Sequence, residues 1–278
     1  MRKIGYKIVK KILDYLEYMS LVKKDRLPGQ ILSLMSLMPY CLRKYLKAYT
    51  LELKSLLFYN LFMEIFMEVL TVDQQEILPK LGFLKEQNFY LAGGTALALQ
   101  IKHRTSVDFD FYTEKDFHPA GIYEQFQKQK NRKILLSAIT EKNTLLLEIN
   151  DVSISLFTYP YPLVQNIVKS HYFSLASLED IAAMKMIAII QRGTKRDFID
   201  LYFLIRKIGL GKIFSFAREK YPGFNEYLAL QSLTYFKDAE IENNNRNIKL
   251  LEPFNWKDAK KFFITEIEKI EETWRRKR

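Results

Sequence analysis

The sequence predicts an α+β protein in which a mixed sheet with flanking helices precedes a C-terminal helical domain. Two observations predict this class. Short apolar or alternating segments gather between residues 89 and 157, and helix-capping patterns with helical periodicity follow from Ser177 onward. The length of 278 residues suits one large or two modest domains. Because 48% of the residues are hydrophobic, a dominantly disordered chain is excluded.

We expect three parts along the chain. Residues 1–62 are predicted to be a basic helical extension, because Ile4, Ile8 and Ile12 follow one another at i, i+4 spacing. Residues 63–165 are predicted to form the core and residues 166–278 the helical domain. The core opens with a helix that Thr71 caps and that Gly82 ends after Leu81.

The predicted sheet segments are short and closely spaced. An apolar strand, Phe89–Ala92, leads through Gly93-Gly94-Thr95 into the helix Ala96–Ile101. The later elements, in chain order, are a strand at Val107–Tyr112, a helix at Ala120–Lys133, and strands at Lys133–Ala138, Thr144–Ile149 and Val152–Phe157. Asn150-Asp151 is typical of a two-residue hairpin turn between the last two strands.

The C-terminal part is predicted to be helical throughout. Ser177–Asp180 and Thr194–Asp197 are capping-box patterns that open helices to about Gln191 and Ile208. Further helices are predicted at Lys212–Lys220, Asn225–Phe236 and Trp256–Trp274, with a loop at Asn243–Asn247.

Composition excludes several classes of protein. One cysteine, Cys41, permits no internal disulfide, and three scattered histidines leave no zinc site. Apolar runs are too short or too charged to span a bilayer, and the N-terminus lacks the order of a signal peptide, so we expect a cytoplasmic protein. Residues 1–62 carry 12 Lys/Arg against four Asp/Glu, most of the net charge of +11. Nucleic acid is the commonest partner of such a charge, although an anionic membrane surface fits residues 1–62 nearly as well.

Residues 89–112 hold the chemically informative pattern. Strand alternation places Asp108 and Asp110 on one face, and two neighbouring carboxylates repel each other unless a cation such as Mg²⁺ lies between them. Gly93-Gly94-Thr95 joins a strand to a helix N-terminus, where backbone N–H groups bind phosphate. Each pattern is weak alone. Together they place a phosphate site next to a metal-binding pair.

This segment resembles the signature of the DNA polymerase beta-type nucleotidyltransferase superfamily, a glycine turn followed by Asp-x-Asp. Its wording, LAGGTALAL followed by HRTSVDFDF, is similar to the AbiEii/AbiGii-type nucleotidyltransferase toxins of prokaryotic phage-defence and toxin–antitoxin systems. Two later stretches agree, FTYPYPL at 157–163 and the helical segment 178–201. The likeness covers roughly residues 65–210 and leaves residues 1–62 outside.

The resemblance implies metal-dependent transfer of a nucleoside monophosphate from an NTP to an acceptor, with tRNA 3′ ends as targets of some members. It therefore implies an NTP substrate, Mg²⁺ or Mn²⁺, an RNA acceptor and a cognate antitoxin as partners. By position it implies a phosphate-binding turn at Gly93, Gly94 and Thr95 and two metal ligands, Asp108 and Asp110. It also implies that Lys185 lies near the triphosphate and that Asp197 and Asp200 are the two acids of a nucleotide-binding motif.

Several of these side chains keep a second interpretation. Lys185 lies on an apolar helix and can snorkel instead of binding phosphate. Arg192 can serve the helix C-terminus or reach a phosphate, and Arg196 with Asp200 can simply brace a helix at i, i+4 spacing. Arg104 is the better candidate for phosphate binding or site architecture, whereas His103 is expected to be structural.

The superfamily usually places a third carboxylate on a later strand, where this chain has Ser155. If Asn150-Asp151 is the turn, Glu148 pairs with Ser153 and shares a face with Ser155, so Glu148 is a candidate third metal ligand. The predicted function is a nucleotidyltransferase toxin that acts on RNA. Nucleotidyl transfer to a protein or a small molecule, and a non-catalytic nucleotide- or RNA-binding module, are the alternatives.

Overall fold

The computed structural model describes residues 65–128, 134–139, 142–170, 172–241 and 248–276. The chain divides into two compact units, Met1–Leu61 and Phe62–Arg278, and the description below concerns the second. The helices predicted within residues 1–62 and the loop predicted at Asn243–Asn247 lie outside the described residues. Within the described ranges, no helix combines the length and apolar character that crossing a membrane requires.

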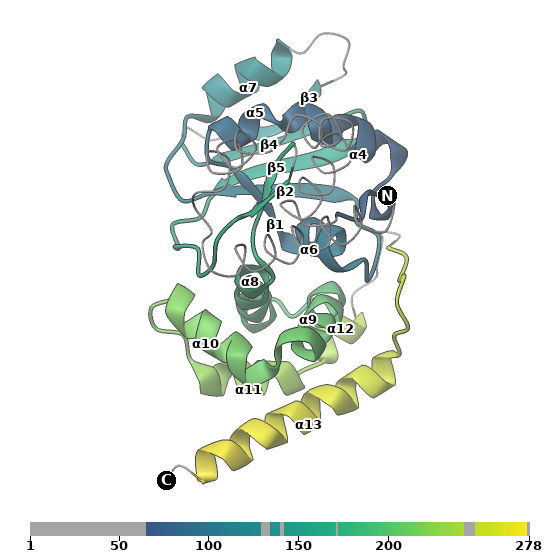
Figure 1. Ribbon diagram of the computed structural model, residues 1–278, viewed down its shortest axis with the longest axis vertical. Coiled ribbons are helices and arrows are strands. Elements are labelled where there is room, and N and C mark those ends of the chain that lie inside the picture. The colour runs from purple at the N-terminus through teal and green to yellow at the C-terminus, as the bar shows by residue number, and fades with distance from the viewer. Residues whose placement is uncertain (1–64, 129–133, 140–141, 171, 242–247, 277–278) are drawn as a thin grey trace, which may run out of the picture. The chain divides into compact units, whose positions relative to one another are not determined.

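A mixed sheet of seven strands, in the order β3-β4-β5-β2-β1-β7-β6, organises the second unit (Figure 1). The strands are β1 (Tyr90–Ala92), β2 (Asp108–Thr113), β3 (Ile134–Ile139), β4 (Thr144–Ile149), β5 (Val152–Thr158), β6 (Val168–Lys169) and β7 (Ser174–Leu175). β2 lies between antiparallel β1 and parallel β5 at the centre of the sheet. The five predicted strands are confirmed within one or two residues at each end. β6 and β7 were not predicted, because two residues are too few to show an alternating pattern.

The β4–β5 hairpin fixes the register of the sheet beside β2. Asn150 and Asp151 both have positive φ, 48° and 64°, as a type I′ turn requires, so the predicted hairpin is confirmed. With this turn, Ile154 of β5 pairs with Leu147 of β4 and with Phe109 of β2, all three buried. The polar alternate positions of β2 and β5 are therefore placed together on the opposite face.

The helices before and within the sheet region are short. They are α4 (Val72–Ile77), α5 (Phe83–Glu86), α6 (Gly93–Ile101) and α7 (Pro119–Gln127), with 3₁₀ turns at Met67–Val69 and Leu78–Leu81. Thr71 and Gln74 form the predicted capping box of α4. The predicted stop at Gly82 is wrong. Its φ of −55° is helical, and the chain continues directly into α5 after the Pro79-containing 3₁₀ turn.

The remaining helices follow the last strand. They are α8 (Leu178–Gln191), α9 (Lys195–Ile208), α10 (Leu210–Lys220), α11 (Glu226–Thr234), α12 (Lys237–Ile241) and α13 (Trp256–Arg275). Ser177 and Thr194 cap α8 and α9 as predicted, each accepting a hydrogen bond from the backbone N–H three residues later. The segment predicted to be helical, 166–278, thus begins with two strands that belong to the sheet.

Helix α8 connects the sheet to the other helices. It contacts α6 on one side and α9, α10 and α11 on others, and it buries apolar side chains around most of its circumference. A helix that is apolar on nearly all sides is an interior helix. One continuous hydrophobic core therefore runs from the sheet into the helices, and it holds α6, α8 and α9 in fixed relation to β2. Figure 1 shows α8 between the sheet and the other helices.

Candidate active site

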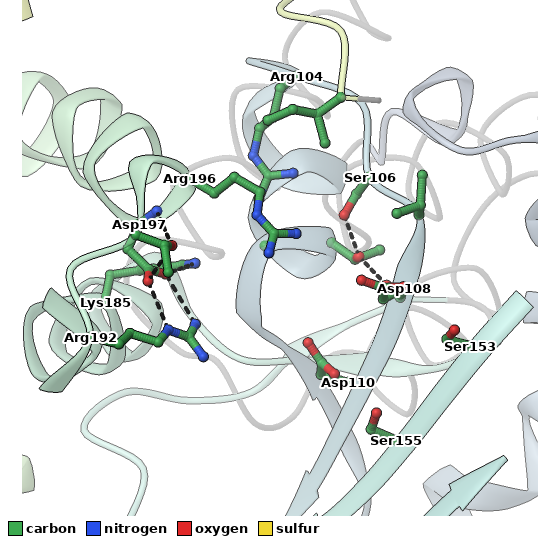
Figure 2. A pocket seen from close by; sticks show the side chains of 15 residues that line it. Arg104, Ser106, Asp108, Asp110, Ser153, Ser155, Lys185, Arg192, Arg196 and Asp197 are labelled. Atoms are coloured by element: carbon green, nitrogen blue, oxygen red, sulfur yellow. Dashed lines mark hydrogen bonds and ion pairs between the residues drawn. The ribbon is translucent and has the colours of Figure 1, made fainter. Parts of the chain in front are cut away.

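A pocket of about 300 Å³ opens where β2, the start of α6 and the α8–α9 turn meet (Figure 2). Most of its lining is polar; the residues are Gly94, Thr95, Arg104, Ser106, Val107, Asp108, Asp110, Ser153, Ser155, Lys185, Arg192, Thr194, Arg196, Asp197 and Ile248. Figure 2 shows Asp108 and Asp110, here called the acidic pair, on one side of the pocket. Arg104, Lys185, Arg192 and Arg196, here called the cationic wall, lie on the other side.

Gly93 and Gly94, here called the glycine turn, follow β1 directly and are the first two residues of α6. A side chain would fit poorly at either position. Gly93 has a φ of +66°, a left-handed conformation that favours glycine. A Cβ on Gly94 would lie 2.1 Å from Nη2 of Arg104, so any side chain would displace that guanidinium. Helix α6 begins directly at the turn, and its N-cap residue, Ala92, makes no side-chain cap. Its first N–H groups are therefore suited to bind an anion, as the sequence predicted.

Thr95 connects the glycine turn to the acidic strand. Its hydroxyl makes a 2.6 Å hydrogen bond with that of Ser106 and donates to the backbone carbonyl of Asp108. A Cβ at Gly93 would lie 3.2 Å from Oδ2 of Asp110, so this carboxylate lies against the turn itself. The two sequence patterns therefore form one site.

The acidic pair lies on the polar face of β2. Asp108 pairs with Ser153 of β5 and Asp110 with Ser155, and all four residues line the pocket. Burial raises the pKa of Asp110, and the charge of Asp108 raises it further. Lys185, Ser155 and Arg192 act in the opposite direction. Two neighbouring carboxylates, with the pKa of Asp110 raised, are typical of a site that a cation stabilises.

Lys185 projects from α8 between two carboxylates of α9. Its ammonium lies 2.9 Å from Oδ1 of Asp197 and 2.7 Å from Oδ2 of Asp200, and only 9% of the side chain is exposed. Burial alone would lower the pKa of Lys185, but the two carboxylates outweigh it and raise the pKa. The snorkelling interpretation is therefore wrong, because Lys185 is a buried, protonated cation at the pocket.

Asp197, in the first turn of α9, holds two cations of the cationic wall, Lys185 and Arg192. It accepts hydrogen bonds from Lys185, from Nε and Nη2 of Arg192 at 2.9 and 3.2 Å, and from the Thr194 hydroxyl at 2.7 Å. Burial would raise the pKa of Asp197, but the Lys185 and Arg192 charges hold it well below its usual range. Arg192 is thus an ion-pair partner of α9 as well as a lining residue, and 64% of its side chain is exposed.

Asp200, one turn further along α9, lies behind the cationic wall. Its side chain is fully buried and does not line the pocket. Oδ1 accepts from Nε of Arg104 and lies 2.7 Å from Nε2 of His103, while Oδ2 accepts from Nη2 of Arg104 at 2.9 Å. Against the effect of burial, Arg104 and Lys185 hold the pKa of Asp200 well below its usual range.

These contacts correct the nucleotide-binding assignment of Asp200, because its oxygens face inward and orient Arg104 and Lys185. Arg196 lines the pocket, and its i, i+4 brace with Asp200 stays a prediction. His103 has the structural role expected of it. Its ring is buried and packs against Phe203 at 5.2 Å, and burial lowers its pKa.

Glu148 has the predicted register but not the predicted position. It pairs with Ser153 of β5 and so lies two strands from Asp108, outside the residues that line the pocket. In the described part of the chain, no three Asp, Glu, His or Cys side chains gather in a way that could hold a metal ion. Glu148 is therefore not a third ligand beside the acidic pair.

Sequence reasoning missed five lining residues, Ser106, Val107, Ser153, Thr194 and Ile248. Ser106 and Thr194 lie within a few residues of Asp108 and Asp197, so proximity to those acids was an available signal. Ile248 carried no signal. Its segment reaches the site because Lys249 and Thr105, 144 residues apart, hydrogen-bond through Thr105 Oγ1 and both backbones.

A glycine turn against paired aspartates at the centre of a mixed sheet, faced by cations, is an arrangement suited to binding the phosphates of a nucleotide. Comparison with known families agrees. Residues 83–276 match the family described as nucleotidyl transferase AbiEii toxin, type IV toxin–antitoxin system. The chain belongs to this family of nucleotidyltransferase toxins, and it is a nucleotidyltransferase.

Relatives and solved structures resemble the chain to different degrees. An uncharacterised protein of Aquifex aeolicus is 38% identical over 208 residues, which cover 72% of this chain and 97% of that protein. The crystal structure of JHP933 from Helicobacter pylori is 16% identical, with a TM-score of 0.46 over 73% of this chain and 91% of that one. MenT4, a nucleotidyltransferase toxin of Mycobacterium tuberculosis, is 14% identical, with a TM-score of 0.44 over 70% and 80% of the two chains.

Proposed function

We propose that this toxin transfers a nucleoside monophosphate from an NTP to an RNA acceptor, with tRNA as the leading candidate, in a reaction that depends on Mg²⁺ or Mn²⁺. The arrangement of the acidic pair opposite the cationic wall, with the glycine turn between them, carries the proposal. The net charge of +11 supports a polyanionic acceptor. The reaction belongs in the cytoplasm, where NTPs and RNA are both present.

The donor set fits a hard divalent cation. Asp108 and Asp110 offer oxygen ligands only, and Mg²⁺ binds through one or two carboxylates together with water and substrate phosphates. When bound there, the cation neutralises charge that develops on the phosphates during transfer. The crowding of the acidic pair supports this assignment.

The chain's own residues position the substrate. The first N–H groups of α6 and the glycine turn would bind phosphate oxygens, and Lys185 and Arg192 would bind the triphosphate from the opposite side. An acceptor hydroxyl then attacks the α-phosphorus. A new O–P bond forms, the bond to pyrophosphate breaks, and the hydroxyl proton passes to water. Because Asp197 and Asp200 already hold these cations in place, little reorganisation is needed during transfer.

The family context supports a role in phage defence or toxin–antitoxin control, with a cognate antitoxin protein as partner. One observation favours a second candidate. Ser155 beside Asp110 leaves the acidic pair without a third carboxylate, which is compatible with a non-catalytic nucleotide- or RNA-binding module.

The test is to incubate the purified full chain with each α-³²P-labelled NTP, Mg²⁺ and total RNA, and to follow the label. We expect label in RNA, and in the tRNA fraction in particular, with none for Asp108→Asn. Label in protein or in a small molecule would mean that the acceptor is that molecule and not RNA. Nucleotide binding without any transfer would favour the non-catalytic module, and neither binding nor transfer would refute the proposal.

A further inference from the structure

The strand beside the acidic pair offers hydroxyls where another carboxylate would complete a second metal site. In the β2–β5 register, Ser155 is the direct neighbour of Asp110 and Ser153 of Asp108, and both serines line the pocket (Figure 2). A serine hydroxyl is neutral and is a weaker ligand for Mg²⁺ than a carboxylate. Within the β2–β5 pair, Asp108 and Asp110 are therefore the only carboxylates on this face.

The strand beyond β5 does not supply the missing charge. Leu146 of β4 is the neighbour of Ser155 on that side, and Glu148 is the neighbour of Ser153. Since adjacent strands lie roughly 4.8 Å apart, Glu148 is about twice that distance from Asp108 along the sheet. Two catalytic cations lie only about 3.5–4 Å apart, so a cation shared with Glu148 would be too far from the acidic pair.

The charge of the pocket also reduces the need for a second cation. Four cationic and three anionic side chains line it. The lining therefore has a net charge of +1, and together with one divalent cation it offsets all but about one charge of a triphosphate of about −4. The cationic wall, on the opposite side of the pocket, would supply further positive charge to the bound phosphates.

We propose that this site holds a single divalent cation for each bound NTP, on Asp108 and Asp110, and that Lys185 and Arg192 take the place of a second ion. The inference rests on the proposed nucleotidyl transfer and specifies how the same site neutralises the substrate. Lys185 is held by two carboxylates and Arg192 by two hydrogen bonds to Asp197, so both charges are already oriented at the pocket before substrate binds.

The experiment counts cations. The full chain is dialysed to equilibrium with Mn²⁺ and an NTP analogue whose α,β-bridge is a methylene group, and protein-bound Mn²⁺ and nucleotide are measured together. We expect about one Mn²⁺ per bound nucleotide, and an electron paramagnetic resonance spectrum of an isolated ion. Ser155→Asp restores a carboxylate beside Asp110, and we expect about two Mn²⁺ per nucleotide with a spin-coupled spectrum.

Two matched variants control for size and charge. Ser155→Asn has the size of aspartate without its charge, and Ser215→Asp adds the same charge at an exposed position of α10. Both should stay at about one Mn²⁺ per nucleotide. About two Mn²⁺ on the unmodified chain would overturn the single-ion inference, as would a nucleotide-binding Ser155→Asp that stays at one. If Ser155→Asp does not fold, the ratio and spectrum of the unmodified chain decide alone.

The outcome also separates this inference from the proposed function. Nucleotide binding and label transfer with two coupled ions would leave nucleotidyl transfer standing and remove only the single-ion inference. A failure of the unmodified chain to bind nucleotide would overturn both.

Discussion

At the residue scale, substitution of the acidic pair tests the metal assignment most directly. Asp108 and Asp110 lie side by side on β2, and burial with the Asp108 charge raises the pKa of Asp110. We expect Asp108→Asn and Asp110→Asn each to lower transfer at least about 100-fold, while the melting temperature without metal stays level or rises slightly because repulsion is relieved. Label transfer and thermal unfolding measure the two effects. Unchanged transfer in both variants would remove the metal assignment.

Gly94 offers a second residue-scale test with a built-in control. Its Cβ would lie 2.1 Å from Nη2 of Arg104, so Gly94→Ala must displace a guanidinium that is bonded to Asp200. We expect it to lose about 1–3 kcal/mol of unfolding free energy and to weaken NTP binding strongly. Gly121 of α7 is exposed, and a Cβ added to it would meet no atom within 4 Å. Gly121→Ala should be neutral or stabilising by up to about 1 kcal/mol, with NTP affinity unchanged. Equal behaviour of the two variants in denaturant titration and NTP binding would contradict the packing argument.

The sequence located individual site residues better than their roles. Gly94, Thr95, the acidic pair and Lys185 all line one pocket, because each belongs to a local pattern of strand, turn or helix. The role of Asp200 could not be predicted, since its partners His103 and Arg104 lie about a hundred residues earlier and nothing local identifies them. Ion pairing over such a separation is decided by the fold.

At the element scale, the same distinction separates predicted from unpredicted structure. The β4–β5 hairpin and the caps at Thr71, Ser177 and Thr194 were predictable, because turn and capping chemistry acts over two to four residues. Strands β6 and β7 exist through β7 pairing with β1, more than eighty residues earlier. Gly82 shows that a glycine after a helical pattern ends the helix only when its backbone turns left-handed.

Helices α8 and α9 are joined by buried charges, which predicts how stability depends on pH. Asp197 and Asp200 have pKa values below their usual range in the folded chain, so their contribution is present above the unfolded value of about 4 and is lost as pH falls through the folded values. Lys185 has a raised pKa, so its contribution is complete below about 10.4 and is lost only at higher pH. We therefore expect these three groups to make the unfolding free energy fall steeply between about pH 4 and pH 2 and to contribute little change from pH 5 to 9.

Asp200→Asn is the variant that tests this link between the helices. It leaves Arg104 and Lys185 buried with one carboxylate fewer, and we expect a loss of about 3–5 kcal/mol at pH 7 that becomes smaller below pH 4. Denaturant titrations of both chains at several pH values give the comparison. A loss of the same size at pH 7 and pH 3 would show that the charge of Asp200 does not matter.

At the scale of the whole molecule, charge is distributed unevenly between the chain's two units. Residues 1–62 carry 12 Lys/Arg against four Asp/Glu, whereas the family match begins at residue 83 and contains the entire candidate site. The division of the chain into an extension, a core and a helical domain remains a prediction. We infer that residues 1–62 supply affinity for a polyanion and that the site supplies the chemistry.

The inference about residues 1–62 predicts a change in salt dependence. The variant replaces five lysines of this segment by glutamine: Lys7, Lys10, Lys11, Lys23 and Lys24. We expect weaker RNA binding and a slope of log affinity against log salt that is shallower by about 0.7–0.9 for each phosphate that is no longer bound. The matched control neutralises five exposed lysines of the helical part, Lys207, Lys212, Lys237, Lys257 and Lys261, and so removes the same charge elsewhere. RNA affinity is measured at several salt concentrations for both variants and the unmodified chain. If residues 1–62 instead form helices that pack on the rest of the chain, their lysines are only solvated. Replacing those lysines will then change the slope no more than the control replacement does. A shallower slope in the first variant alone means that this segment, rather than total charge, binds the phosphates.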